Sequence, residues 1–309
     1  LLNSLPLFSK FSNTSNISED ISILPEIINE IRGNSIYNNK ETVIVVPSTP
    51  DLNQHNISFF GRRFGGNIVG RQLGNRNVDA QFLIDQSEWV ILAEGDQGSV
   101  KRTAFILDSA VRNEGVFNQI RVFPRNNGGS YSLWRRSPNA KSPITFDQKF
   151  TNLAQGLESG PKGIEAVFEE VEVQHMIDGH LNYREKVIDN ANKILKTNPN
   201  HIQSRWDLAL IYILANRPNE ADTHLGVLEN LLIDNPWPSI YRIIVNLADL
   251  KPWKATKVAR IADSKYDNIV IRAMRDISSV ASGRVWHFRS AYSSVPQAIN
   301  YINRLLNDD

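Results

Sequence analysis

Cysteine is absent from the 309-residue chain. This absence excludes disulfide bonds, thiol nucleophiles and zinc sites built from thiolates. The chain also lacks any apolar run of about 18 residues or more, so none of its own segments is predicted to span a membrane. Its formal net charge is only +1, without the basic excess typical of nucleic-acid binding proteins, so no nucleic-acid partner is predicted.

Catalytic sequence motifs are missing as well. The chain contains no GxGxxG, GxxxxGKS/T, HExxH or GxSxG pattern, the signatures of dinucleotide, nucleotide, zinc-protease and serine-hydrolase sites. Serine, histidine and aspartate residues are scattered along the chain rather than grouped. The sequence therefore predicts no catalytic residue and no cofactor.

The length of the chain is enough for about two domains, since one domain usually holds roughly 100 to 200 residues. The first segment, residues 1–42, opens without methionine and without the basic start of a signal peptide. Either the chain is cut from a longer parent whose membrane segment ends just upstream, or its boundary is arbitrary. Apolar residues at helical spacing predict an amphipathic helix over Ser22–Arg32 that packs on the following domain.

Residues 43–137 alternate between predicted strands and helices. Val43–Val46 and Trp89–Ala93 are wholly apolar runs, typical of strands buried on both faces, and Asn67–Gly70 is a shorter strand. Thr49 is expected to cap a helix whose first residue is Pro50. The pattern predicts an α/β domain, with a mostly parallel sheet and an antiparallel edge hairpin. Its other elements are helices over Asp79–Gln86 and Val100–Asn113 and hairpin strands over Gln119–Phe123 and Ser130–Trp134.

Residues 144–309 follow a Pro- and Ser-rich linker and contain helical rather than strand-like patterns. Within them, Arg205–Asp234 matches the packing positions of a tetratricopeptide repeat, with a turn at Asn216–Asn219. The sequence therefore predicts an all-α tetratricopeptide-like domain. The matching positions are Leu208, Ala209, Tyr212, Ala221, Leu225 and Leu228, and three tryptophans near helix starts are expected to pack between helices: Trp237, Trp253 and Trp286.

The main candidate for a ligand site follows the first predicted strand. Ligands of parallel α/β sheets bind outside the carboxyl ends of the strands, where helix amino termini present free amides. A guanidinium group there suits a phosphate or an acidic sugar, because it binds two oxygens at once. The alternative is that the hydroxyl groups cap a helix and the arginines are solvated. The candidate residues are Ser48, Thr49, Asn53, Arg62, Arg63 and Arg71.

Two weaker candidates lie elsewhere in the chain. Ser99 and Lys101 follow the strand Trp89–Ala93, but the loop lacks the spacing of a phosphate-binding P-loop. A simple helix cap at Ser99 is therefore favoured over anion binding. A helix face with three glutamates and a histidine offers half of a four-helix carboxylate metal site, and the missing second half favours a solvated face and no metal. These residues are Glu165, Glu169, Glu172 and His175.

Several long stretches are similar to a known family. Val43–Gly74, Glu88–Val100 and Gly128–Arg136 resemble the soluble C-terminal region of bacterial membrane glycosyltransferases related to the dolichyl-phosphate-mannose protein mannosyltransferases. Pro161–Val187 and Asn235–Trp253 look like the helical extension of some photosynthetic-bacterial members. The resemblance covers most of the chain from Val43 onward, and it rests on long segments rather than on a short catalytic motif.

This resemblance implies a parent enzyme that transfers a sugar from a polyprenyl-phosphate donor outside the cytoplasmic membrane. The family's catalytic acidic residues belong to loops of the membrane part, and no position of this chain matches them. The implied role is that of a non-catalytic, soluble, extracytoplasmic region, anchored through an upstream membrane part of the same parent. It would assist binding of the donor sugar or the acceptor, or recruit a protein partner through the helical array.

Two alternatives to this role stay open. In the first, the repeats are a protein-interaction scaffold and the α/β part is structural. In the second, the chain is a free-standing enzyme that uses the cleft above Pro47. The second is disfavoured, because the chain has neither a phosphate-binding glycine motif nor a clustered acid pair.

Overall fold

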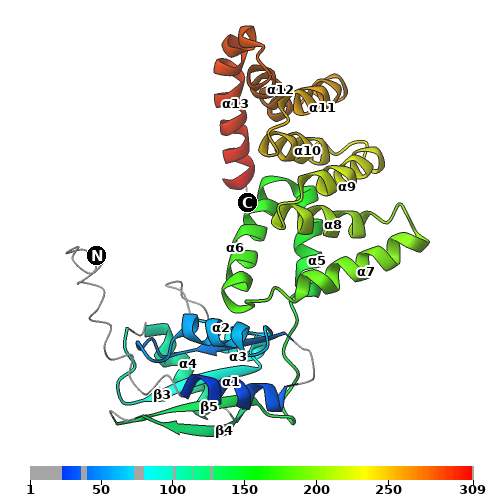
Figure 1. Cartoon of the computed structure of the whole chain (residues 1–309). Coiled ribbons are helices and arrows are strands. Elements are labelled where there is room, and N and C mark those ends of the chain that lie inside the picture. Colours follow the sequence, from blue (N-terminus) through cyan, green and yellow to red (C-terminus); the bar gives the residue numbers. More distant parts are fainter. Residues whose placement is uncertain are drawn as a thin grey trace, which may run out of the picture. The chain divides into compact units, whose positions relative to one another are not determined.

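The computed structural model describes residues 23–35, 40–72, 80–99, 102–113, 115–125 and 128–307. The chain divides into two compact units (Figure 1). The α/β unit contains the chain up to Ile144 together with Val173–Leu181, and the helical unit contains Thr145–Glu172 and Asn182–Asp309. The predicted fold class, an α/β region followed by an all-helical region, is confirmed.

A five-stranded sheet with the strand order β2-β1-β3-β5-β4 forms the centre of the α/β unit. β1 (Glu41–Val45) pairs in parallel with both β2 (Ile68–Arg71) and β3 (Trp89–Glu94). β4 (Phe117–Pro124) and β5 (Ser130–Arg136) form an antiparallel hairpin at the edge, and β5 pairs antiparallel with β3. All of the predicted strands are present, including the edge hairpin.

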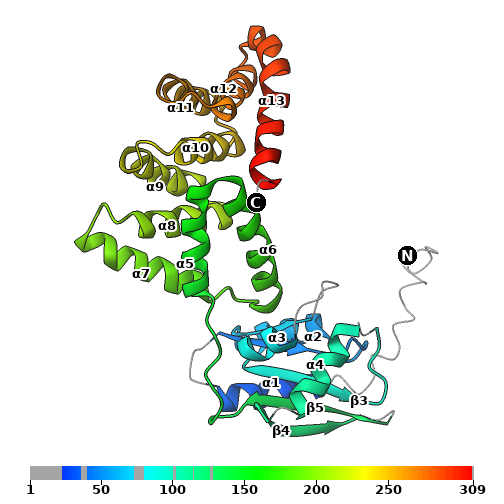
Figure 2. The same cartoon turned by 180° about the vertical axis from the view of Figure 1, so that it is seen from behind.

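Helices cover both faces of this sheet (Figures 1 and 2). α1 (Ile23–Asn34) and α2 (Gln54–Arg63) share one core with the sheet. α3 (Ala80–Gln86) and α4 (Arg102–Asn113) share the core on the opposite face. The runs Val43–Val46 and Trp89–Ala93 are apolar throughout because neighbouring residues of a central strand face opposite layers. In β1 and the residue after it, Val43 and Val45 enter the first core, and Ile44 and Val46 enter the second.

The helical unit is built from consecutive helices that pack on their neighbours in sequence, as Figure 2 shows for α8 to α13. Packing of each helix mainly on its neighbours is the arrangement expected of a repeat array. Its elements are α5 (Asp147–Gly156), η2 (Leu157–Ser159), α6 (Pro161–Ile177, of which residues to Glu172 belong to this unit), α7 (Tyr183–Thr197), α8 (Ile202–Leu214), α9 (Pro218–Leu231), α10 (Trp237–Ala248), α11 (Pro252–Lys265), α12 (Ile269–Ala281), η3 (Val285–His287) and α13 (Phe288–Asn307).

The predicted repeat is present in the pair formed by α8 and α9. Ala209 and Leu225 have no exposed surface, as the small and large packing positions of such a repeat require. The chain reverses at Asn216, which has a φ of +54°, and Pro218 opens α9, where its missing amide donor is not needed. The turn and both helices therefore agree with the sequence prediction.

The packing role expected of the three tryptophans is right at one position only. Trp237 is half-buried and stacks on Tyr241, with the ring centroids 6.1 Å apart. Trp253 and Trp286, by contrast, are 66% and 71% exposed. The prediction is wrong for these two residues, because the helices on which they lie turn those positions away from their neighbours.

None of the helices in the described part of the chain combines the length and the apolar character needed to cross a bilayer.

Candidate functional site

The predicted ligand site lies where the strand order of the sheet reverses. β1 is followed by β2 on one side and, after α3, by β3 on the other side. In open α/β sheets such a reversal creates a crevice between the carboxyl ends of the two diverging strands, and ligands bind there. The loops that follow β1 and β3 therefore decide what this edge can hold.

These two loops close the crevice with their own backbone. The amide of Ser48 donates a hydrogen bond to the carbonyl of Gln97 at 2.9 Å, and the amide of Ser99 donates to the carbonyl of Ser48 at 3.3 Å. Gly98 has a φ of +68°, and a Cβ atom at this position would overlap the Ser48 carbonyl. The amides of Ser48 and Ser99, which were candidates for holding an anion, are thus used to join the loops.

The helix after β1 starts later than predicted, and its cap is Asn53 rather than Thr49. The Oδ1 atom of Asn53 accepts hydrogen bonds from the amides of His55 and Asn56, at 2.9 and 3.1 Å. Thr49 instead forms a turn with Leu52, exchanging hydrogen bonds with both its amide and its carbonyl. This local turn competes with helix formation and delays the start of α2 to Gln54.

The predicted arginines do not gather at this edge. Arg62 and Arg63 lie in the last turn of α2, about 14 Å along the helix from its cap. Because α2 runs back across the sheet, the two side chains lie toward the amino end of β1, where both are exposed. The prediction that they lie beside Ser48 is wrong, because ten helical residues separate the two ends of α2.

Arg71 does lie at the carboxyl edge, as the last residue of β2. Its guanidinium group donates a hydrogen bond to the carbonyl of His175 at 2.7 Å, and its buried Nε has no partner within the described structure. Arg71 therefore ties the sheet to the residues of α6 that belong to the α/β unit. The remaining candidate, Lys101, lies outside the described residues.

A buried polar network at this edge was not anticipated from the sequence. The hydroxyl of Tyr131 donates a hydrogen bond to Asp51 at 2.8 Å and lies 2.7 Å from the hydroxyl of Thr49. The guanidinium of Arg125 packs 4.7 Å from the centre of the Tyr131 ring, 3.7 Å from the Asp51 carboxylate. Arg125 also donates to the carbonyl of Asp96 at 2.6 Å. The hairpin turn, the β1 loop and the β3 loop are joined by these contacts.

The charge states in this network favour a structural role. Burial raises the pKa of Tyr131, and the bond to the Asp51 carboxylate raises it further, so the phenol keeps its proton at neutral pH. Burial alone would raise the pKa of Asp51, but hydrogen bonds from Tyr131 and Thr49 outweigh it and hold the pKa below its usual range. Neither group is poised to transfer a proton near pH 7.

A sequence signal for this network did exist. Tyr131 occupies a buried position of β5, in register with Phe123 of β4 and Ala93 of β3, so its hydroxyl needed a polar partner. The partners are Asp51 and Arg125, which are 80 and 6 residues away along the chain, and only the folded sheet brings all three side chains together.

The predicted glutamate and histidine face of α6 does not collect metal ligands. Glu165, Glu169 and Glu172 are exposed on the helix, and His175 is half-buried. Among the residues that the structure describes, no group of three or more His, Asp or Glu side chains is arranged to hold a metal ion.

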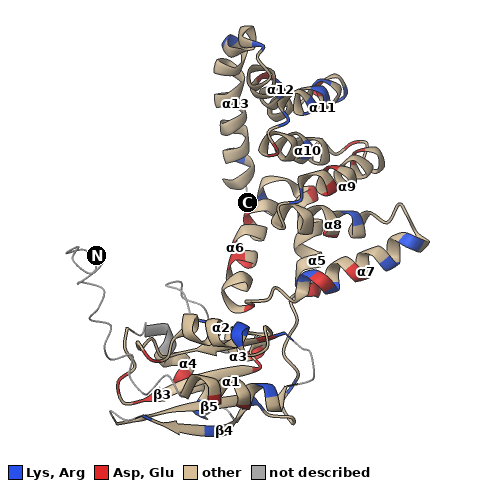
Figure 3. Cartoon of the chain, in the orientation of Figure 1, with Lys and Arg blue, Asp and Glu red and all other residues tan. Residues whose placement is uncertain are grey.

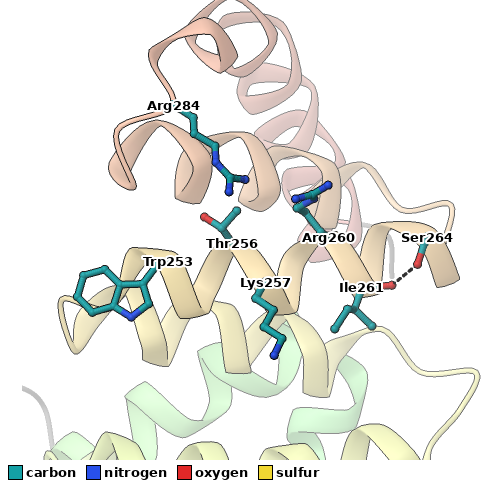
Figure 4. Close-up of a pocket in the computed structure, with 7 residues that line it drawn as sticks. All are labelled: Trp253, Thr256, Lys257, Arg260, Ile261, Ser264 and Arg284. Carbon is teal, nitrogen blue, oxygen red and sulfur yellow. Dashed lines mark hydrogen bonds between the residues drawn. The ribbon is translucent and has the colours of Figure 1, made fainter.

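A second candidate site lies in the helical unit, along α11 (Figure 4). Trp253, Lys257, Arg260 and Ile261 are all exposed on this helix, and Arg284 faces it from the segment after α12. Together they border an open groove of about 530 Å³. Figure 3 shows the basic residues of α11 in blue. Among the described residues that line the groove, none is acidic.

Comparison with known proteins finds no similarity: no family model matches the chain, and neither a curated protein nor a solved structure does.

Proposed function

We propose that this chain is a non-catalytic recognition region that binds a protein partner through its helical array. One contrast carries this proposal. At the reversal of the sheet, where an α/β enzyme would bind its substrate, the loops after β1 and β3 are hydrogen-bonded to each other. The α11 groove, in contrast, is open and presents two arginines and an exposed tryptophan, residue types that are enriched in protein interfaces.

The parent protein that we propose is a polyprenyl-phosphate-sugar dependent membrane glycosyltransferase. The resemblance of the long stretches from Val43 onward supports it. In such a parent, this chain would lie on the extracytoplasmic face of a bacterial membrane, beside the transmembrane part that carries out the transfer. The reading frame upstream of Leu1 tests this assignment: roughly ten hydrophobic spans are expected there, and a signal peptide or start codon in their place would refute it.

Photo-crosslinking tests the interaction role. A photoreactive residue is placed singly at Trp253, Phe168 or Tyr292 of the helical unit, which are 66%, 68% and 81% exposed, and at Phe59 of the α/β unit, which is 53% exposed. In cells that express the full-length parent, we expect reproducible protein adducts from positions of the helical unit. Adducts only from Phe59, or adducts only to a lipid-linked sugar, would contradict a protein-binding array.

Donor binding at the sheet edge is the second candidate function, and one observation favours it. Arg71 is at the carboxyl edge of β2 and has a buried Nε atom without a partner in the described structure. Titration of the chain with a short-chain polyprenyl phosphate tests this role. Arg62→Ala is the matched control, because Arg62 lies in the last turn of α2, away from the carboxyl edge of the sheet. We expect no saturable binding. Saturable binding that Arg71→Ala abolishes and Arg62→Ala leaves intact would establish donor recognition instead.

A further inference from the structure

We infer that the α11 groove binds an extended, acidic segment of the protein partner, with apolar residues flanking its carboxylates. This inference rests on the proposed protein-binding role of the helical array and specifies its partner. Three properties of the groove support an acidic partner: its uncompensated charge, its fixed walls and the spacing of its apolar ends.

The cations of the groove lack the acidic partners that several other cations of this unit have. Lys257, Arg260 and Arg284 make no side-chain hydrogen bond or ion pair within the described structure. An acidic ligand would therefore supply the missing charge without displacing an existing ion pair. Several other basic residues of the unit are paired: Arg217 with Glu220, Arg242 with Asp222 and Glu229, Lys254 with Asp222, Arg272 with Asp267, and Arg275 with Asp263 and Asp276.

Hydrogen bonds hold the wall that carries Arg284 beside α11. The hydroxyl of Thr256, a buried residue of α11, lies 3.3 Å from that of Ser282, the residue that ends α12. Gly283 follows with a φ of +89°, and the amide of Arg284 donates to the carbonyl of Ser279 at 3.0 Å. Figure 4 shows the Arg284 side chain reaching from this segment toward Thr256, with Arg260 on the same side of α11. The backbone that carries Arg284 is thus fixed by a hydrogen-bonded turn, and Arg260 is carried by helix α11 itself. Fixed backbones on both sides of the groove lower the entropic cost of binding.

The apolar ends of the groove fit an extended peptide. Trp253 lies at the start of α11 and Ile261 nearer its end, and they are 66% and 56% exposed. Eight helical residues separate them by about 12 Å, the length of roughly four residues of an extended chain. A peptide with two apolar side chains at that spacing would place its intervening carboxylates over Arg260 and its neighbours. A single phosphate group would reach only part of this surface.

Two other grooves of the described structure lack this combination. The groove bordered by α7 and α9 includes Asp189 next to its lysines, and its Arg205 already donates to the carbonyl of Pro199 at 2.7 Å. The groove beside α1 carries Glu26 and Glu30, both of which are paired with Arg121. Charge complementarity therefore selects the α11 groove for an acidic partner.

Fluorescence anisotropy with the whole chain tests the inference. The probe is a labelled peptide with a run of glutamates between two leucines, and the control peptide carries glutamines in their place. We expect saturable binding of the acidic peptide only, weakening as salt is raised, because the groove is open to solvent and salt screens its charges. Arg260→Glu and Arg284→Glu should each weaken binding about tenfold. Lys186→Glu changes the net charge equally at an exposed position of α7 and should alter binding less than about twofold.

Three outcomes of the binding experiments would overturn the inference. The first is equal binding of the acidic and the neutral peptide. The second is equal weakening of peptide binding by Lys186→Glu and by the groove variants. The third is absence of peptide binding together with binding to phosphatidylglycerol vesicles that the groove variants abolish. Protein crosslinks from the helical unit that persist in the Arg260→Glu, Arg284→Glu double variant would also overturn it, but would leave the proposed interaction role in place. Acidic-peptide binding by a chain that forms no protein crosslinks would support the groove and refute that role.

Discussion

Two buried aspartates of the helical unit differ in the charges that face them. Asp207 and Asp222 are each 6% exposed. Asp207 accepts a hydrogen bond from Gln203 at 3.0 Å, and burial raises its pKa to about 6. Burial acts on Asp222 in the same direction, but hydrogen bonds from Lys254 and Asn246 and the charge of Arg242 lower its pKa below the usual value. The contrast makes the two residues a natural pair for mutation.

Asp207→Asn is expected to stabilise the protein at pH 7. The folded-state pKa of about 6 lies above the unfolded value, so the contribution of Asp207 to stability is fully present below about pH 4 and is lost as the pH rises through 6. The asparagine side chain removes this loss, which we expect to be about 1 to 3 kcal/mol. Urea denaturation at pH 4 and pH 7 measures it. Asp222→Asn is the control and should destabilise at pH 7, because it leaves Lys254 without its carboxylate and Arg242 with only Glu229.

A Tyr131→Phe variant tests the polar network at the sheet edge. Removing the hydroxyl leaves the Asp51 carboxylate without its 2.8 Å hydrogen bond, and we expect a loss of about 1 to 3 kcal/mol at pH 7. The lowered pKa of Asp51 contributes stability above the unfolded pKa that is lost as the pH falls, so the variant should cost less near pH 3. Chemical denaturation at both pH values measures the difference.

Tyr266→Phe provides the matched control, because the Tyr266 hydroxyl is buried without a hydrogen-bond partner in the described structure. Its removal should be neutral or slightly stabilising at both pH values. An equal loss in the two variants would show that the Tyr131 network adds no stability of its own.

At the scale of the elements, the contact between the β1 and β3 loops depends on one glycine. Gly98→Ala places a methyl group against the Ser48 carbonyl and also strains a left-handed backbone. Gly66→Ala is the control, since Gly66 has a φ of +76° and open space where its Cβ would lie. We expect a loss of about 1 kcal/mol at Gly66 and at least about 2 kcal/mol at Gly98. Equal losses, measured by chemical denaturation, would mean that the loop contact is not tight.

The geometry of the turn and helix after β1 also explains where the sequence prediction of the site failed. Ser48, Thr49 and Asn53 are adjacent to the edge as expected, but the turn from Thr49 to Leu52 uses the polar groups that were assigned to a ligand. The arginines at the end of α2 were expected nearby because they are close in sequence. Helix length separates them in space, since each helical residue advances the chain by about 1.5 Å.

At the scale of the whole molecule, the two compact units are expected to open separately. Ile91→Ala removes a fully buried side chain from the sheet, and Leu225→Ala does the same between helices of the array. Each cavity should cost about 2 to 5 kcal/mol in its own unit. Native-state hydrogen exchange, which reports opening region by region, should show the loss of protection confined to the altered unit. Equal loss throughout the chain would instead indicate a single cooperative transition.

The sequence alone determined the class and order of the elements. Hydrophobic periodicity and turn residues are local properties, so the buried strands, the edge hairpin and the α8–α9 repeat could all be predicted from the chain. Tertiary structure decided which side chains meet. The Tyr131 network unites residues distant in sequence, the α11 groove adds Arg284 from another element to the face of one helix, and exposure at Trp253 depends on how neighbouring helices pack. Such contacts follow from strand order and helix packing, and a local pattern does not specify them.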